Sequence, residues 1–347
     1  MFRQSNILMP TDFSHYALYA MRYAVAIAKR YGGSVHVAHV LDSSLFAHGS
    51  GHGLGLTKAD LERLMASMEE HAESRLAHLV RIAREDGVPA EKHIARGKPA
   101  AEIIRLADEA ECDMIAIATH GRTGVDHIVF GSVAEKVVRQ APVPVLSIKH
   151  PEHEFVHQDE AGFSFDLERI LFPTDFSELS NRALPYAASL CRRFDATLVL
   201  LHASEVPIVL PEFMPDTAAT VGTEMEERAQ ECLERMRGEL EGIRVEPVAK
   251  TGVAYREICQ TVQEDHVDLV VMPTHGRSGF GHVLFGSVAE KVVRLARCPV
   301  LTVRPEGAAP DTVPVRDTES ATAPGAVLPG APGAAPAPGA ADPAPAP

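Results

Sequence analysis

Short apolar runs alternate with longer amphipathic stretches over the first 149 residues. The apolar runs cover residues 7–9, 34–41, 89–95, 113–118 and 143–149. Between them, residues 14–31, 57–86 and 99–110 and a segment beginning at Ser132 carry apolar positions at helical spacing. This alternation predicts strand and helix repeated four times with a closing strand, which is typical of a parallel sheet covered on both faces.

The second half of the chain repeats this order. Its apolar runs cover residues 169–172, 197–202, 245–250, 269–272 and 299–303. Residues 119–148 recur at residues 274–303, with twenty of the thirty positions identical. The offset between the halves falls from 163 at their starts to 155 here, so the first half holds a net eight extra residues. The natural place for them is its His/Gly loop, residues 48–55. The repeat predicts two tandem domains.

The boundaries follow from changes in composition. We predict one domain over residues 1–149, a polar, acidic linker over residues 150–167 and a second domain over residues 168–305. Residues 306–347 hold ten of the chain's 25 prolines, with alanine and glycine filling most of the rest. Such a segment cannot form an apolar core, so it predicts a disordered or polyproline-like tail.

Charge and cysteine content narrow the function classes. The net charge of −14 argues against a nucleic-acid surface, but it leaves room for a small anion bound by backbone amides. Five scattered cysteines without CxxC spacing indicate reduced thiols. We expect a cytoplasmic protein without a membrane partner, because neither a secretory signal nor an apolar run of bilayer-spanning length is visible.

The repeated stretch holds the main candidate site. Gly121 and Gly131 bracket a loop that leads into a helix, and such loops can present backbone N–H groups to a phosphate. Ser132 and Glu135 have the spacing of a capping box, which is an alternative, purely structural role for the serine. His120 could donate to a phosphate or close the turn, and Arg122 could add positive charge. The copies of these residues are His275, Gly276, Arg277, Gly286 and Ser287.

A second candidate follows the first strand. If strands one and four are neighbours, Asp12 and Gly121 emerge side by side at the carboxyl edge, where open α/β sheets bind ligands. Asp12 could accept a hydrogen bond from a ribose or a base, or it could simply cap the next helix. His48 and His52 could bind a metal, but a flexible surface loop is the simpler interpretation.

At these residues the chain resembles the universal stress protein family. The features are the start PTDFS, the strand end His39-Val40 and the segment GSVAEKVVR followed by PVPVL, and the match covers residues 3–149 and 167–304. The resemblance implies two Rossmann-like, adenine nucleotide alpha hydrolase-like domains. Each would have a five-stranded parallel sheet of order 3-2-1-4-5.

The ATP-binding branch of that family has the pattern G-x-x-G, nine residues, then G-S/T. Here Ala118 and Pro273 replace the first glycine, and the later elements match. The resemblance therefore implies an ATP-type nucleotide site that is better in the first domain. Its candidate residues are Pro10, Thr11, Asp12, Val40, Ala118, His120, Gly121, Arg122, Gly131, Ser132 and Val133 in the first domain, and Thr174, Asp175, Ala203, His275, Gly276, Arg277, Gly286, Ser287 and Val288 in the second.

The expected function is that of a nucleotide-binding stress-response protein and not of an enzyme. An ATP-independent interaction module and a weak ATPase or autophosphorylating protein are the alternatives. The final strands, residues 143–149 and 298–304, are apolar on both faces, and the family often pairs such strands across a dimer. Here they could pair within one chain as a pseudo-twofold dimer, and a homodimer is a further possibility.

Overall fold

The two halves of the chain contribute equivalent strands to one sheet. In the computed structural model, which describes residues 5–42, 57–119, 130–149, 155–159, 162–206, 215–275 and 285–304, the sheet has ten strands. The first half supplies β1 (Ile7–Pro10), β2 (Val35–Asp42), β3 (Ala90–Gly97), β4 (Met114–Ala118) and β5 (Val145–Ile148). The second half supplies β8 (Arg169–Pro173), β9 (Thr197–Ser204), β10 (Arg244–Thr251), β11 (Leu269–Pro273) and β12 (Val300–Val303).

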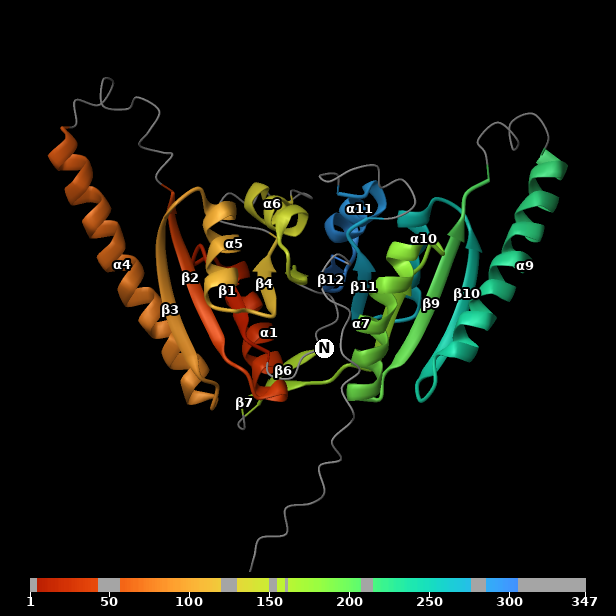
Figure 1. Cartoon of the computed structure of the whole chain (residues 1–347), viewed down its shortest axis with the longest axis horizontal. Helices are drawn as coiled ribbons and strands as arrows, with labels where there is room; N and C mark the ends of the chain where they lie inside the picture. The colour runs from red at the N-terminus through yellow and green to blue at the C-terminus, as the bar shows by residue number, and fades with distance from the viewer. Residues whose placement is uncertain are drawn as a thin grey trace, which may run out of the picture. The chain divides into compact units, whose positions relative to one another are not determined.

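Within each half the strands are parallel and have the order 3-2-1-4-5. The whole sheet runs β10-β9-β8-β11-β12-β5-β4-β1-β2-β3 (Figure 1). At its centre β5 and β12 pair antiparallel, with Leu146 opposite Leu301. Both leucines are buried, at 2% and 3% exposure. This pairing within one chain is the arrangement that the apolar final strands predicted.

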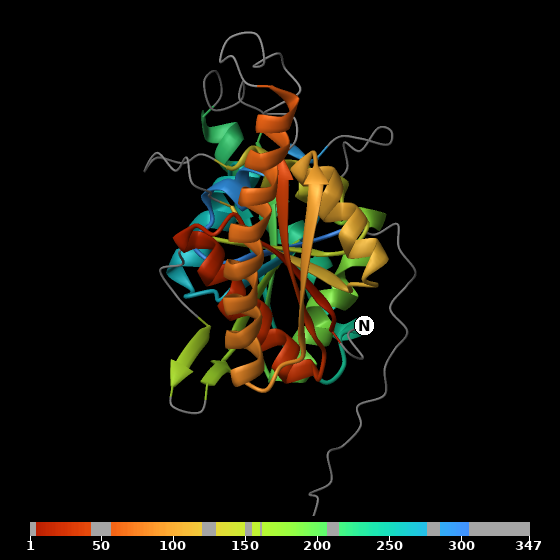
Figure 2. The ribbon, with the colours of Figure 1, turned by 90° about the vertical axis from the view of Figure 1, so that its left-hand side faces the viewer.

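Helices cover both faces of the sheet. One face packs against α1 (His15–Tyr31), α4 (Lys58–Glu85), α7 (Glu178–Phe194) and α9 (Pro215–Glu239). The other packs against α5 (Pro99–Glu109), α6 (Ser132–Gln140), α10 (Ala254–Glu264) and α11 (Ser287–Leu295). Figure 2 shows α4 lying along β2 and β3. The α/β architecture with two-sided cover is therefore the one expected from the alternating pattern.

The ends of α1 show why the sequence pattern located this helix well. Ser14 precedes the helix and its Oγ accepts a hydrogen bond from the Ala17 N–H at 3.2 Å. Gly32 ends it in the left-handed conformation, with φ of 64°, and its N–H bonds the carbonyls of Ala28 and Lys29. A serine cap and a glycine at the C-terminal end are the signals from which the predicted limits came.

The segment between the halves contains structure that the prediction of a polar linker missed. Strands β6 (Val156–Asp159) and β7 (Gly162–Phe165) form an antiparallel hairpin beside α1 (Figure 1). Phe155 is 1% exposed, and its ring meets the Tyr23 ring of α1 edge-on at 4.9 Å. The polar residues around these apolar side chains hid their role, because only a few positions of the segment enter the core.

Some predicted segments lie outside the described residues. These are the His/Gly loop with His48 and His52, and the proline-rich tail over residues 306–347. Among the helices that are described, none has an apolar stretch long enough to cross a bilayer.

Candidate functional site

Strands β1 and β4 separate toward their carboxyl ends. They pair only at Ile7 with Met114 and at Leu8 with Ile115, whereas β4 stays paired with β5 up to Ala118. Strand β1 meanwhile remains paired with β2 as far as Pro10. The separation opens a crevice between strands one and four, which is the switch point where open α/β sheets bind ligands.

A cavity of about 280 Å³ occupies this crevice. Eight of the predicted site residues line it: Pro10, Thr11, Asp12, Val40, Ala118, Gly131, Ser132 and Val133. The structure thus brings together residues from the ends of β1, β2 and β4 and from the start of α6. Its walls also include Ala17, Ala38, His39, Pro99, Ile103, Ile117, Thr119 and Ala134, which sequence reasoning did not assign to the site.

Asp12 lies in the tight turn between β1 and α1. Its Oδ1 accepts a hydrogen bond from the Ser14 N–H at 2.9 Å, and Thr11 Oγ1 accepts one from the Phe13 N–H at 2.9 Å. Phe13 has a left-handed φ of 63°, which is uncommon for a bulky residue and bends the chain sharply after β1. The alternative interpretation of Asp12 as the helix cap is wrong, because Ser14 is the N-cap.

His39 supports this turn from the neighbouring strand. Its Nδ1 donates to the Thr11 carbonyl oxygen, 2.7 Å away, and its ring packs against that of Phe13 at 4.5 Å. His202 makes the same bond to Thr174 in the second half. This recurrence at one offset was the available sequence signal for a positioning histidine.

The start of α6 forms another part of the cavity wall. Gly131 is the N-cap residue and Ser132 is the first helical residue, with no side-chain cap hydrogen bond among the described residues. The predicted Ser132–Glu135 capping box is therefore wrong, and so is its copy, because Gly286 caps α11 in the same way. The helix begins one residue earlier than a Ser132 cap requires, because the Gly131 carbonyl accepts the first helical bond, from Glu135 N–H.

The absence of a side-chain cap matters for anion binding. Without one, the first N–H groups of α6 have neither an intrahelical partner nor a serine oxygen. Together with the helix dipole they form a typical anion-binding arrangement. Gly131 allows the close approach that places them, since its N–H donates to the Thr119 carbonyl at 2.8 Å and a Cβ at Gly131 would lie 3.1 Å from that oxygen.

Comparison with known proteins fits this arrangement. The model of the universal stress protein family matches residues 4–149 and 167–304. The chain belongs to the universal stress protein family. The two matches are two tandem universal stress protein domains, and they correspond to the two halves of the sheet.

Individual relatives span one domain or both. A universal stress protein of Methanocaldococcus jannaschii is 34% identical over 150 residues, which is 43% of this chain and 84% of the relative. One of Mycobacterium tuberculosis is 29% identical over 246 residues, covering 68% of this chain and 78% of the relative. A solved universal stress protein from Archaeoglobus fulgidus has the same fold, with a TM-score of 0.62 and 24% identity over 88% of this chain and all of that one.

The first motif glycine of the ATP-binding branch is replaced in both universal stress protein domains. Ala118 and Pro273 are each the last residue of a regular strand, and neither has a positive φ. The backbone at this position therefore accepts a side chain without strain. Consecutive N–H groups of a strand point to opposite edges of the strand. The Thr119 N–H donates to the Ile148 carbonyl on the β5 side. The Ala118 N–H is therefore directed to the other side, toward the crevice. Pro273 has no N–H to offer there.

The second domain keeps the turn but has bulkier walls. Thr174 and Asp175 repeat the bonds of Thr11 and Asp12, and Phe176 has a φ of 60°. Leu201, 1% exposed, stands where the first domain has Ala38. Glu205 accepts a hydrogen bond from the Ala254 N–H at the start of α10, which brings a carboxylate to this edge of the sheet.

The other predicted residues are placed by the same repeat. Ala203 lies near the end of β9, His275 follows β11, and Gly286, Ser287 and Val288 form the start of α11. His120, Gly121 and Arg122 of the first domain and Gly276 and Arg277 of the second lie outside the described residues.

Proposed function

We propose that the first domain binds an adenine nucleotide of the ATP type in the cavity between β1 and β4. The observation that carries the proposal is that a carboxylate and a helix N-terminus lie in the wall of one cavity. Asp12 and the start of α6, which has no side-chain cap among the described residues, both line it. A carboxylate can accept hydrogen bonds from ribose hydroxyls, and helix N–H groups favour a phosphate.

The remaining walls suit a purine base. Ala38, Val40 and Ile103 are apolar, and Pro99 adds a flat ring at the start of α5. The volume of about 280 Å³ lies close to the lower end of the range of known ligand pockets. The phosphates would extend toward α6, where the helix dipole compensates part of their charge.

Site preference follows from the differences between the domains. In the second domain Leu201 replaces Ala38 and adds three carbon atoms at a position that lines the first cavity. Pro273 removes the N–H that Ala118 directs toward the crevice in the first domain. The proposed stoichiometry is therefore one tightly bound nucleotide per chain.

The proposed role is regulated binding and not turnover. A bound nucleotide would set a state of the protein that a partner recognises during a stress response. Among the described residues of the cavity wall, Asp12 is the sole carboxylate, and it accepts the Ser14 N–H. The proposal predicts that labelled ATP bound to the protein remains intact.

The test combines nucleotide analysis with calorimetry on the full chain. Protein purified from cells is denatured and its released nucleotide is identified, and nucleotide-free protein is then titrated with ATP. We expect one ATP per chain, with affinity reduced at least ~10-fold by Ala38→Leu, which fills the cavity with the residue that the second domain already accommodates. Ala203→Val, a small enlargement of the second domain, is the matched control and should leave the affinity unchanged.

Other outcomes point to other functions. Equal tight binding at two sites would contradict the preference for the first domain. No binding would favour an ATP-independent interaction module of the same fold. Hydrolysis that Asp12→Ala abolishes would favour a weak ATPase.

A further inference from the structure

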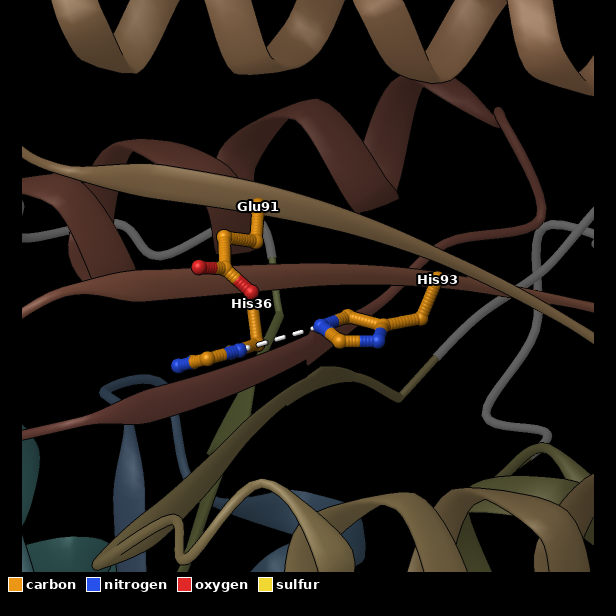
Figure 3. A group of neighbouring side chains, drawn as sticks. All are labelled: His36, Glu91 and His93. Atoms are coloured by element: carbon orange, nitrogen blue, oxygen red, sulfur yellow. Dashed lines mark hydrogen bonds between the residues drawn. The ribbon is translucent and has the colours of Figure 1, made fainter.

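Two histidines and a glutamate gather on β2 and β3 of the first domain (Figure 3). His36 lies on β2, and Glu91 and His93 lie on β3. The parallel register pairs His36 with Glu91 and Ala38 with His93. Register partners in a sheet share a face, so all three side chains lie on the face that α5 covers.

The distance between the ring nitrogens of the two imidazoles is close to that of two histidines bound to one metal ion. Nδ1 of His36 lies 3.0 Å from Nε2 of His93, and the ring planes differ by 30°. One ligand atom from each of the three residues lies within 4.8 Å of the others. Two nitrogens on one tetrahedral Zn²⁺ are roughly 3.3 Å apart, because each Zn–N bond is about 2.0–2.1 Å. Zn²⁺ binding would therefore lengthen the distance between the two nitrogens by only a few tenths of an ångström, and the Glu91 carboxylate, which lies within 4.8 Å of them, would move toward the ion.

A hydrogen bond behind His36 directs its lone pair toward His93. Ser34 Oγ donates to Asn6 Oδ1 at 2.9 Å, so it accepts from His36 Nε2 at 3.1 Å. This bond holds the proton on Nε2 and leaves Nδ1 unprotonated on the side of His93. Outer hydrogen bonds of this kind orient metal-binding histidines in proteins.

The second domain shows what the same position looks like without this cluster. There Val199 and Val248 replace the two histidines, while Glu246 keeps the place of Glu91. Arg169 forms an ion pair with Glu246 at 2.5 Å. In the first domain Asn6 replaces that arginine, and among the described residues Glu91 forms no ion pair with a lysine or an arginine. In the part that the structure describes, the first domain thus has no arginine beside its glutamate, and it has two imidazoles where the second domain has valines.

We propose that His36, Glu91 and His93 bind a divalent metal ion of the zinc type. Two imidazoles and one carboxylate are a common set of zinc ligands, and a water would complete the tetrahedron. The ion joins β2 to β3, which is the end strand of the sheet. It therefore acts as a clamp on an edge strand and does not depend on whether the cavity binds a nucleotide.

The test measures Zn²⁺ binding by the full chain without an affinity tag. Protein stripped with a chelator is titrated with Zn²⁺ against a competing chromophoric indicator. We expect one strong site per chain, weakened at least ~100-fold in the double variant His36→Val/His93→Val and ~10-fold by Glu91→Gln. The valines are the residues that the second domain carries at these positions, so the fold accommodates them.

Two controls separate this site from the other histidines of the chain. His78→Ala, on the exposed surface of α4, should bind Zn²⁺ like the wild type. Zn²⁺ should raise the melting temperature of the wild type and of His78→Ala but not that of the double variant, whose circular dichroism without metal should match the wild type. Equal Zn²⁺ affinity in the wild type and the double variant would overturn the proposal. Absence of a strong site in the wild type would also overturn it, and would leave a hydrogen bond between two neutral imidazoles.

Discussion

At the scale of single residues, small side chains distinguish the first domain from the second. Ala38 and Ala118 line the cavity, and their counterparts Leu201 and Pro273 are larger. Gly131 has a related role, because it allows the Thr119 carbonyl to approach the start of α6. These positions contribute space and backbone N–H groups, so substitutions there test the shape of the site and not its polar chemistry.

Gly131→Ala should destabilise the first domain. The added Cβ would lie 3.1 Å from the Thr119 oxygen, so β4 and α6 must move apart. We expect the free energy of unfolding in urea to fall by about 1–2 kcal/mol, which is typical of overpacking. Gly238→Ala is the matched control, because a Cβ there meets nothing within 4 Å on exposed α9. It should be neutral or stabilise by about 0.5–1 kcal/mol. Equal losses in the two variants would contradict the packing argument.

Individual residues also show where sequence reasoning reached its limit. The sequence predicts Asp12 from its place after the first strand and Gly131 and Ser132 from motif spacing, and all three line one cavity. Their local roles were less predictable, since Ser14 and Gly131 cap the helices for which Asp12 and Ser132 were candidates. Cap position depends on where the preceding loop fixes the chain. The Gly131 N–H bond to Thr119 joins the loop to a strand end and leaves no mark in the helix sequence.

At the scale of elements, periodicity predicted the helices and sheet strands, and it failed at β6 and β7. The sheet strands are nearly continuous apolar runs because both of their faces are buried. The hairpin is exposed on one side, so its apolar residues, among them Phe155, Val156 and Phe163, are interspersed with polar ones. A two-stranded hairpin is marginal by itself and depends on packing against a neighbour, in this case α1. Sequence pattern does not reveal such a partner.

Phe155→Ala should therefore lower the stability of the protein strongly, although the sequence around Phe155 resembles a polar linker. The ring is 1% exposed and packs edge-on against Tyr23. Removing it should lower the free energy of unfolding by about 3–5 kcal/mol, measured by urea denaturation. Ser164→Ala on the exposed side of β7 should change it by less than about 0.5 kcal/mol. A small effect of Phe155→Ala would show that the hairpin is not part of the folded core.

At the scale of the whole described molecule, the two domains share a sheet, and at its centre each domain donates hydrogen bonds from a basic side chain to the other domain. Lys149, after β5, donates from Nζ to the carbonyl oxygens of Arg294 and Ala296 at the end of α11. Arg304, its counterpart after β12, donates to the Gln140 carbonyl at the end of α6. Each domain thus places a cation at the negative end of the other domain's last helix, where the helix dipole favours it. The apolar final strands predicted their pairing, but these exchanged contacts depend on three-dimensional register.

Lys149 should make stability depend on pH in a defined window. Burial lowers its pKa from 10.5 to about 8, with the nearby Arg294 acting in the same direction. Between these two values the unfolded chain binds more protons than the folded protein, so the free energy of unfolding rises with pH. The cost of burying the charged amine persists in full below pH 8 and is relieved above pH 10.5. At about 1.4 kcal/mol per pKa unit, the gain is at most roughly 3.5 kcal/mol.

The measurement compares the wild type with Lys149→Met by urea denaturation from pH 7 to pH 10.5. Other groups titrate at high pH in both proteins, so the informative quantity is the difference in free energy of unfolding between them. We expect the free energy of unfolding of the wild type to rise relative to that of Lys149→Met as the pH rises from 8 to 10.5. Arg304→Met is the matched control, since a guanidinium stays charged throughout and its difference from the wild type should remain flat. Parallel curves for the wild type and Lys149→Met would show that the amine at the domain junction is as well solvated when folded as when unfolded.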